Sequence, residues 1–362
     1  MKESFSSYSE KDVVFLLKNL NGMLEEQSTE ERERMIQSGG HYSEMLPVEY
    51  VPSPIYMDLY HQSLKRNKQM VADSVAALAE VLLVHRGPSM VLVSLARAGS
   101  PAGILIKRYL KSRYGFDVPH FSISIVRGKG IDENALRYLL KRYSDADLIF
   151  VDGWTGKGAI TKELTEAVEM FNKNNDTSIS PELAVLADPG VCATFSGTQE
   201  DFLIPSSLLN STVCGLVSRT VLREDLIGPN DFHGAKYYEH LIPEDLSYPF
   251  IESVEACFPQ KPKMGICSKE PLWTGMEDAC KIQRDFSVES IHFIKPGIGE
   301  TTRVLLRRMP WKVILDESVS EDHADVRHVV QLAREKSVPV ERMSLQAYRC
   351  CGIIKSVKGD QE

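Results

Sequence analysis

DLIFVDGWTGKGAITK, residues Asp147 to Lys162, is the stretch around which we expect this chain to fold. Its four apolar residues at 148–151 are typical of a buried parallel strand, and Asp152 closes that strand. A glycine-rich turn at 153–158 follows, and then a helical pattern from Ala159 to Phe171. This order directs backbone N–H groups and the positive end of a helix dipole at one point, which suits a phosphate group.

The side chains of this turn are also suited to an anion. Thr155 offers a hydroxyl and Lys157 a positive charge. Gly156 and Gly158 let the backbone approach a ligand closely. Asp152, at the carboxyl end of the strand, is placed to hold sugar hydroxyls or a phosphate-bound Mg²⁺. On this stretch alone, a strand–turn–helix connection that binds no ligand is the alternative.

A second strand–turn–helix unit precedes this one, at residues 90–115. A strand is predicted from Met90 to Leu95, and a helix from Pro101 to Arg113, with proline near its first turn. The tight turn between them offers Ser94, Arg97 and backbone N–H groups. Two such turns, one for each phosphate cluster of a ligand, are a more specific signal than either turn alone.

A third basic turn lies between the two units. The alternating residues 121–126 predict a strand that ends at the turn 127–130, which contains Arg127 and Lys129. A turn of this kind is placed to close over a diphosphate, and a solvent-exposed turn is the alternative.

Helices are predicted in other parts of the chain. Residues 9–20 and 57–86 repeat apolar residues on one helical face. Residues 207–222 form a largely apolar helical run that carries Asn210 and Arg219. If buried, these two polar side chains need partners, supplied either by a ligand or by an internal network.

The composition is that of a globular protein, with 43% hydrophobic residues, 25% charged residues and a net charge of −8. Its 362 residues are enough for two domains. No apolar run reaches the length of a membrane span, and the polar N-terminus does not resemble a secretory signal. The seven cysteines include no C-x-x-C pair, which favours a reducing compartment. We therefore expect a cytoplasmic enzyme without a membrane partner.

The turn at 152–158 resembles the phosphoribosyl-diphosphate loop of type I phosphoribosyltransferases. Those enzymes usually carry two adjacent acidic residues before the Thr-Gly pair, whereas this chain has Asp152 alone. Longer segments resemble the StiP family of bacterial stress and tellurite-resistance gene clusters, over almost the whole chain. These segments are HYSEML (41–46), SLARAGSPAG (94–103), SISIVRGKGID (122–132), FVDGWTGKGAI (150–160), DFLIPSSLLNSTVCGLVSRTVL (201–222) and FHGAKYY (232–238).

The StiP resemblance implies a phosphoribosyltransferase-like domain over residues 1–259, built as a doubly wound parallel sheet. It implies transfer of a ribose 5-phosphate unit from phosphoribosyl diphosphate, with Mg²⁺, to a nucleobase-like or RNA-linked acceptor. Carried onto this chain, the implied catalytic residues are Arg97, Lys129 and Asp152. Asp152 also holds the magnesium. The implied ligands of the phosphoribosyl substrate are Ser94, Gly99, Arg127, Thr155, Gly156, Lys157 and Gly158. The acceptor-side candidates are Asp201, Asn210, Arg219 and His233.

Residues 260–362 resemble a Pelota-type RNA-binding domain, which implies a small αβα sandwich. The segment 297–303 is similar to the Gly-x-Asn-Glu-x-Thr-Lys segment of Pelota and of kink-turn-binding ribosomal proteins, with Gly299 in place of the asparagine. The RNA-binding residues that this similarity implies are Gly297, Gly299, Glu300, Thr302 and Arg303. A structural module or a dimer interface is the alternative, and a homo-oligomer is left open.

A cysteine-protease description also accompanies the StiP family, with Cys192 and Cys214 as its candidates here. Cys214 lies in the predicted apolar helix, where a buried thiol is inert, and no Cys/His/Asn signature surrounds either residue. Phosphoribosyl transfer is therefore the leading expectation. A non-catalytic nucleotide- or RNA-binding protein comes second, and a thiol hydrolase third.

Overall fold

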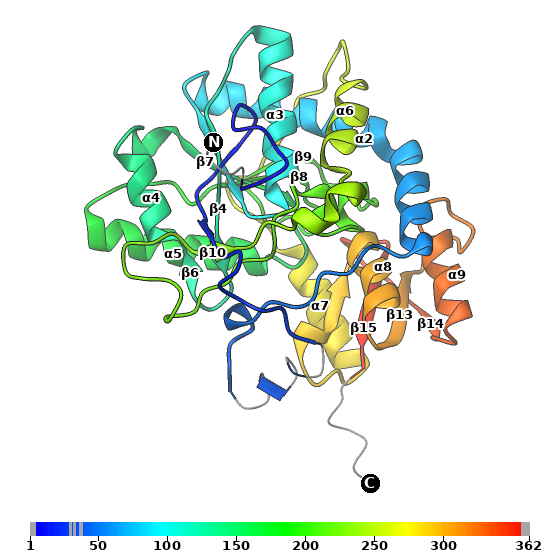
Figure 1. Cartoon of the computed structure of the whole chain (residues 1–362). Coiled ribbons are helices and arrows are strands. Elements are labelled where there is room, and N and C mark those ends of the chain that lie inside the picture. Colours follow the sequence, from blue (N-terminus) through cyan, green and yellow to red (C-terminus); the bar gives the residue numbers. More distant parts are fainter. Residues whose placement is uncertain (1–4, 29–30, 32–33, 36–38, 356–362) are drawn as a thin grey trace.

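The computed structural model describes residues 5–28, 31, 34–35 and 39–355 (Figure 1). The first part of the chain is built on a seven-stranded sheet in which each pair of neighbours from β1 to β9 is parallel and β11 is antiparallel to β9. In sheet order the strands are β1 (Val14–Phe15), β4 (His120–Ile123), β3 (Val91–Leu95), β7 (Leu148–Trp154), β8 (Leu183–Ala187), β9 (Phe195–Thr198) and β11 (Ile266–Cys267). The expected α/β class with a mainly parallel sheet is confirmed.

Helices cover both faces of this sheet because its central strands are apolar on both sides. In β7, Ile149 and Val151 join the core on one face, and Leu148 and Phe150 join the core on the other. The first core is covered by α2 (Pro54–Arg86), α3 (Gly99–Tyr114) and α6 (Ser247–Glu255). The second core is covered by α4 (Glu133–Leu140) and α5 (Ala159–Asn175).

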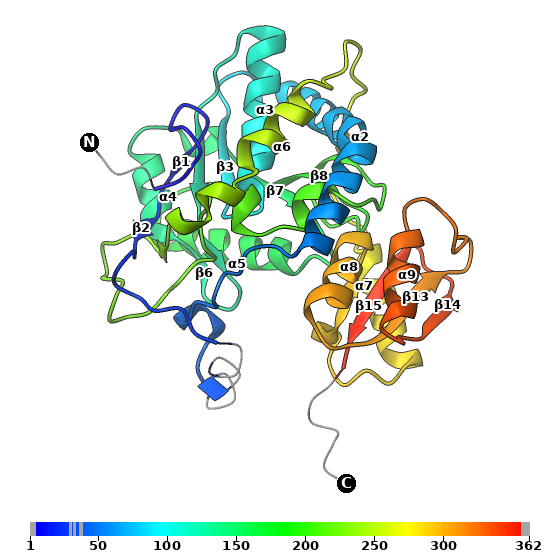
Figure 2. The ribbon, with the colours of Figure 1, turned by 45° about the vertical axis from the view of Figure 1, so that its right-hand side comes forward.

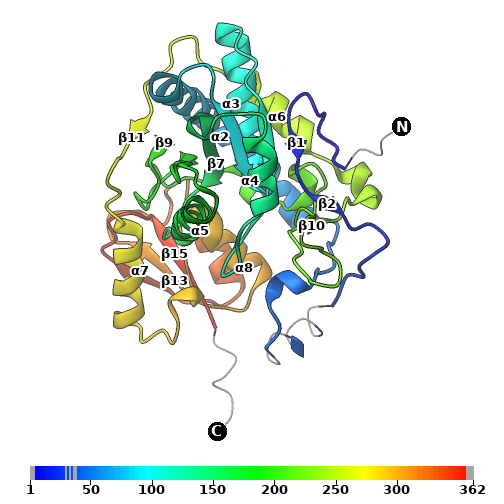
Figure 3. The same cartoon turned by 90° about the vertical axis from the view of Figure 1, so that its left-hand side faces the viewer.

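The C-terminal part is a three-layer αβα sandwich, as expected. Its four-stranded sheet has the order β12 (Ile294–Pro296), β15 (Cys350–Ile354), β13 (Pro310–Asp316) and β14 (Val340–Met343). Its helices are α7 (Thr274–Asp285), α8 (Ile298–Arg307) and α9 (Arg327–Glu335). Figure 3 shows β13 and β15 between α7 on one side and α8 on the other.

The two parts share one hydrophobic core. Leu203, Ile204 and Leu208 of the first part are fully buried in the same cluster as Ile298 and Leu305 of α8. Figure 2 shows α8 and α9 below the lower end of α2. The C-terminal part is therefore packed against the carboxyl ends of the parallel strands by apolar burial as well as by polar contacts.

The remaining regular elements are short. They are β2 (Lys18–Asn19), β10 (Gly234–Ala235), β5 (Ile125–Val126), β6 (Gly130–Ile131) and the 3₁₀ turns η1 (Tyr42–Glu44), η2 (Asp145–Asp147), η3 (Pro205–Ser207), η4 (Ser211–Val213), η5 (Glu239–Glu244) and η6 (Ile291–Phe293). Within the described residues, no helix is long and apolar enough to cross a membrane.

The helix expected at 9–20 is wrong, because this segment turns at 10–12 and then runs extended through β1 and β2. Its apolar side chains enter separate clusters: Val13 joins the core under α2 and α3, and Leu16 joins the core under α4 and α5. Leu17 and Leu20 enter two further clusters. A helix would place these side chains on one face, whereas the tertiary structure needs them on several sides.

The helix expected at 207–222 is also wrong. The segment forms parts of η3 and η4 and then turns at Gly215 and Leu216, whose φ angles are +72° and +58°. Leu208 joins the main core, whereas Leu216 packs in a different cluster near Leu20. This loop brings Cys214 to the carboxyl ends of the central strands β3 and β7, near Ala98 and Trp154, instead of placing it in a helix.

Candidate functional site

Two adjoining cavities lie at the carboxyl ends of β3 and β7, between the first part and α8. The smaller one, of about 80 Å³, is called the thiol pocket and is lined by Arg97, Ala98, Trp154, Ser206, Ser207, Leu209, Asn210, Cys214 and Arg303. The larger one, of about 230 Å³, is called the cation cavity. Its lining includes Arg127, Asp152, residues 154–161, residues 294–296 and Glu300. Ala98 and Trp154 line both cavities, so the two are neighbours.

Two glycines set the close packing around these cavities. A Cβ atom at Gly99 would lie 2.4 Å from the carbonyl oxygen of Val151, so only glycine lets the start of α3 approach β7. Gly158 has a φ of +82°, and a Cβ there would lie 2.2 Å from the Trp273 ring. The turn before α5 is therefore pressed against the C-terminal part, and its glycine serves protein packing.

Cys214 follows η4 and is 5% exposed at the wall of the thiol pocket. Burial raises the pKa of its thiol to about 12, and the carboxylates of Glu49 and Asp152 act in the same direction. The guanidinium groups of Arg97 and Arg303 favour the thiolate and oppose this rise. The resting thiol is therefore protonated and has two cations close enough to stabilise its anion.

Asp152 sits at the end of β7 and lines the cation cavity next to this pocket. Its Oδ1 accepts a hydrogen bond from the Gly153 backbone N–H at 2.7 Å. Burial raises the pKa of its carboxyl to about 7. A carboxyl group with this pKa exchanges a proton readily near neutral pH, as a general base requires.

Arg97 and Asn210 of the thiol pocket are held by other protein groups. Arg97 Nη1 donates to the carbonyl oxygen of Val217 at 3.0 Å and lies 4.0 Å from Glu49 Oε1. Asn210 Oδ1 accepts from Nη1 of Arg307 at 2.7 Å. These contacts fix the orientation of both side chains.

Two residues expected to hold a phosphate have partners within the protein. The Thr155 hydroxyl donates to Oδ1 of Asp188. Lys157 Nζ donates to the backbone carbonyls of Ile291 and, at 2.8 Å, of Ile294. Both donors therefore serve to join elements of the fold, although Thr155 and Lys157 also line the cation cavity with Gly156.

The other two expected phosphate turns are also occupied by protein groups. Ser94 is fully buried, where its hydroxyl donates to the Gly99 carbonyl at 2.9 Å and lies 2.8 Å from His120 Nε2. In the basic turn, the N–H groups of Gly128 and Gly130 donate to the Glu163 carboxylate at 2.7 and 2.9 Å. Arg127 lines the cation cavity, and Lys129 is exposed.

The acceptor-side candidates do not converge on one ligand. Asp201 accepts hydrogen bonds from the backbone N–H groups of Ile298, at 3.0 Å, and Arg349, at 2.9 Å. Arg219 lies over the Tyr42 ring, 5.3 Å from its centre. His233 contacts the Ser124 hydroxyl at 2.9 Å through Nδ1 and the Asp132 carboxylate at 2.6 Å through its backbone N–H.

All the residues expected to read RNA except Thr302 face the first part of the chain. A Cβ at Gly297 would lie 3.2 Å from Asp201 Oδ1, and a Cβ at Gly299 would lie 2.9 Å from the Ser207 hydroxyl. Glu300 lines the cation cavity, and Arg303 lines the thiol pocket. Thr302 is fully buried, where its hydroxyl bonds to the Ile298 carbonyl at 2.7 Å and to His328 Nε2 at 2.9 Å. Glu300 and Arg303 therefore form part of the wall of the site, whereas Thr302 is bonded within the C-terminal part.

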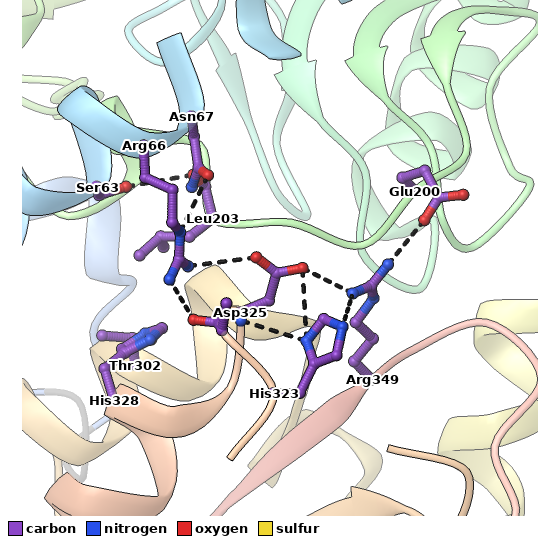
Figure 4. Close-up of polar contacts among 11 residues, drawn as sticks. Ser63, Arg66, Asn67, Glu200, Leu203, Thr302, His323, Asp325, His328 and Arg349 are labelled. Carbon is purple, nitrogen blue, oxygen red and sulfur yellow. Dashed lines mark hydrogen bonds and ion pairs between the residues drawn. The ribbon is translucent and has the colours of Figure 1, made fainter. Parts of the chain in front are cut away.

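A polar network also joins the C-terminal part to the first part (Figure 4). Asp325, from the C-terminal part, accepts from Arg66 of α2 at 3.3 Å and from Arg349 at 2.6 Å. Arg349 also donates to Glu200, which follows β9, at 2.9 Å. The network therefore connects two elements of the first part to the C-terminal sandwich.

The lining residues that the sequence reasoning missed include Trp154, Thr161 and Lys295. Lys295 lies in β12, far from the turns in sequence, so only the packing of the two parts brings it to the cavity.

In the described portion of the chain, no group of three or more His, Cys, Asp and Glu side chains is arranged to hold a metal ion. The magnesium role of Asp152 stays a prediction.

Comparisons with known proteins bear directly on the expected reaction. Residues 6–255 match the family described as "Tellurite-like stress resistance cysteine protease StiP", and residues 273–356 match the "PELOTA RNA binding domain". A relative from Acinetobacter baylyi, named "Cysteine protease StiP", is 34% identical over 376 residues, which cover 99% of this chain and 96% of the relative.

These descriptions overturn the expected phosphoribosyltransferase function, because both the family and the relative are named cysteine proteases. The expectation of phosphoribosyl diphosphate as the substrate is wrong with it. The expectation failed for a physical reason: the donors of Thr155 and Lys157 bond to protein groups. A sequence pattern reveals such donors without revealing what they bind.

Proposed function

The chain belongs to the StiP family, described as cysteine proteases, and on this premise we propose that it is a thiol hydrolase of peptides with Cys214 as its nucleophile. The observation that carries the assignment is the position of Cys214 on the wall of the thiol pocket, which Arg97 and Arg303 also line. This reading replaces the inert helical cysteine that the sequence pattern had indicated, because Cys214 lies in a loop.

Cys192 is the other cysteine that the sequence singled out, and its surroundings support a structural role. It is fully buried, and its thiol donates to the Gly156 carbonyl at 3.3 Å. Burial and the Asp188 carboxylate raise the pKa of this thiol well above its usual value. Unlike Cys214, Cys192 lines neither the thiol pocket nor the cation cavity, so a substrate in these cavities does not reach its thiol.

In the proposed reaction the Cys214 sulfur attacks the carbonyl carbon of a peptide bond. Asp152 accepts the thiol proton as the S–C bond forms, and it then gives that proton to the leaving amine as the C–N bond breaks. Water hydrolyses the resulting thioester and returns a proton to the sulfur. Arg97 and Arg303 stabilise the negative charge that develops first on the sulfur and then on the carbonyl oxygen.

The test is the cleavage of a mixed peptide library, read by mass spectrometry as newly formed termini. We expect the wild type and Cys192→Ser to cleave the same bonds, and Cys214→Ser to lose cleavage. Equal activity of Cys214→Ser and the wild type would contradict the assignment of the nucleophile.

A second activity is favoured by a separate observation. We propose that residues 273–356 bind RNA, because this segment matches a family described as an RNA-binding domain. The test is the fluorescence anisotropy of a labelled RNA hairpin titrated with the full chain at several salt concentrations. Contacts to phosphates make the affinity fall steeply with salt.

We also propose a domain boundary at residues 259–260. The two family matches end at residue 255 and begin at residue 273, which supports a boundary in this interval. A phosphoribosyltransferase type for the parallel sheet, a cytoplasmic location and a homo-oligomeric state stay predictions.

A further inference from the structure

The cation cavity gathers positive side chains from three separate elements. Arg127 comes from the turn after β5, Lys157 from the turn before α5, and Lys295 from β12 of the C-terminal part. Two acidic residues, Asp152 and Glu300, share the lining. Glu300 Oε1 already accepts from Arg303 Nη1 at 2.7 Å, so this carboxylate serves a cation outside the cavity.

The cations in this cavity repel one another. Burial, together with the charges of Lys295 and Arg127, lowers the pKa of Lys157 to about 8. Burial and the charges of Arg127, Arg308 and Arg303 likewise lower the pKa of Lys295. The Glu300 carboxylate opposes this decrease but only in part. A bound anion would relieve this repulsion and restore both ammonium groups to full charge.

The first turn of α5 adds groups that bind anions. Ala159, Ile160 and Thr161 line the cavity at the N-terminus of this helix of 17 residues, where the helix dipole is positive. Thr161 is 9% exposed, and its hydroxyl lies beside the Cys192 thiol without a hydrogen bond of ordinary geometry. Because a thiol is only a weak hydrogen-bonding group, this hydroxyl is available to a stronger acceptor such as a ligand oxygen.

We propose that the cation cavity binds the side-chain carboxylate of an acidic residue in the peptide substrate. This inference rests on the proposed thiol hydrolase. Because Ala98 and Trp154 line both cavities, a peptide whose carbonyl group meets Cys214 has the cation cavity within reach of a neighbouring side chain. Lys295, Arg127 and the Thr161 hydroxyl then contact the carboxylate, and the enzyme prefers Asp or Glu beside the cleaved bond.

Binding is tested without turnover, so that it is separate from the proposed reaction. Calorimetry with glutarate, a dicarboxylate, is carried out on Cys214→Ser and on the same variant with Lys295→Met or Thr161→Val added. We expect each addition to weaken glutarate binding roughly tenfold, as loss of a hydrogen bond to a charged group does. The matched control is Lys173→Met, which removes an exposed lysine from the last turn of the same helix and leaves binding unchanged.

A second measurement detects proton uptake by the protein when the anion binds. Near pH 8, Lys157 takes up protons when an anion binds, so the measured heat depends on the ionisation enthalpy of the buffer. Absence of glutarate binding, or binding that neither Lys295→Met nor Thr161→Val weakens, would overturn the proposal. Binding of inorganic phosphate but not of glutarate would overturn the assignment to a carboxylate.

Substrate preference is then measured with paired peptides that carry Glu or Gln beside the cleaved bond. We expect KM to be lower for the Glu peptide, and we expect Lys295→Met to remove this difference without a comparable change in kcat. An equal KM for both peptides would overturn the substrate assignment. Specific glutarate binding by a protein that cleaves neither peptide would instead contradict the hydrolase itself while leaving the anion site in place.

Discussion

Asp201, in the segment after β9, accepts a hydrogen bond from the backbone N–H of Ile298, so a side chain of the first part caps helix α8 of the C-terminal part. Its second oxygen accepts from the Arg349 backbone N–H at 2.9 Å, next to β15. One carboxylate therefore satisfies two backbone donors at the junction. It holds the wall of the thiol pocket in place against the parallel sheet.

The burial of this carboxyl makes the stability of the junction depend on pH, because the two backbone hydrogen bonds offset the burial only in part. Burial raises the pKa of Asp201 to about 6, so the folded protein binds a proton there more tightly than the unfolded chain does. The stabilising contribution is complete below the unfolded pKa, near 4, and is lost as the pH rises to about 6. The free energy of unfolding of the wild type, relative to Asp201→Asn, should therefore be larger at pH 4.5 than at pH 7.

Urea unfolding at the two pH values measures this difference, which we expect to be on the order of 2 kcal/mol. Asp285→Asn is the control, because Asp285 is exposed at the end of α7. A difference between the wild type and Asp201→Asn that stays constant with pH would contradict the role of this carboxyl.

The pH dependence of peptide cleavage should follow Asp152. As the base that accepts the Cys214 proton, its carboxyl must be ionised, so kcat/KM should rise as the pH increases through about 7. Asp152→Asn should lower kcat/KM by roughly 10² to 10⁴ and remove this rise. Initial rates from pH 5 to 9 provide the measurement. A rise of the same shape in Asp152→Asn would identify another base.

Gly158 and Gly156 form a matched pair for testing how the turn before α5 is packed. Gly158→Ala places a Cβ at positive φ and 2.2 Å from the Trp273 ring, so we expect a loss of roughly 2 kcal/mol or more in the free energy of unfolding. Gly156→Ala places its Cβ 3.7 Å from Pro296, an ordinary contact, and should change stability much less. Denaturant unfolding of both variants measures this, and equal losses would contradict the packing argument.

A disulfide across the junction tests whether α8 binds RNA in the closed arrangement. A Cβ at Gly299 would lie 3.5 Å from Ser207 Cβ, a separation that a disulfide can span. In Ser207→Cys/Gly299→Cys, we expect the oxidised form to bind RNA at least about tenfold more weakly than the reduced form, because the RNA-reading segment stays covered. Anisotropy titrations of the same sample, with and without reductant, supply the control. Equal affinities would place the RNA on another face.

The sequence was most informative where local periodicity and tertiary packing agree. The apolar run of β7 and the helical pattern of α5 were predicted because the period of side-chain burial is local. The αβα sandwich of the C-terminal part was expected from its resemblance to Pelota-type domains. At 9–20 and 207–222, a helical spacing of apolar residues was misleading, because neighbouring side chains such as Val13 and Leu16 enter separate cores.

The candidate site also shows the difference between what local sequence predicts and what tertiary packing decides. The sequence by itself placed Asp152 and Lys157 at the end of a parallel strand, because the strand, the glycine turn and the helix follow one another directly along the chain. Only the tertiary structure decided what these groups meet. Lys157 binds carbonyls 134 and 137 residues away, and Arg303 reaches the pocket of Cys214 from another part of the chain. A one-dimensional pattern states which donors and charges exist, whereas their partners depend on how distant elements pack together.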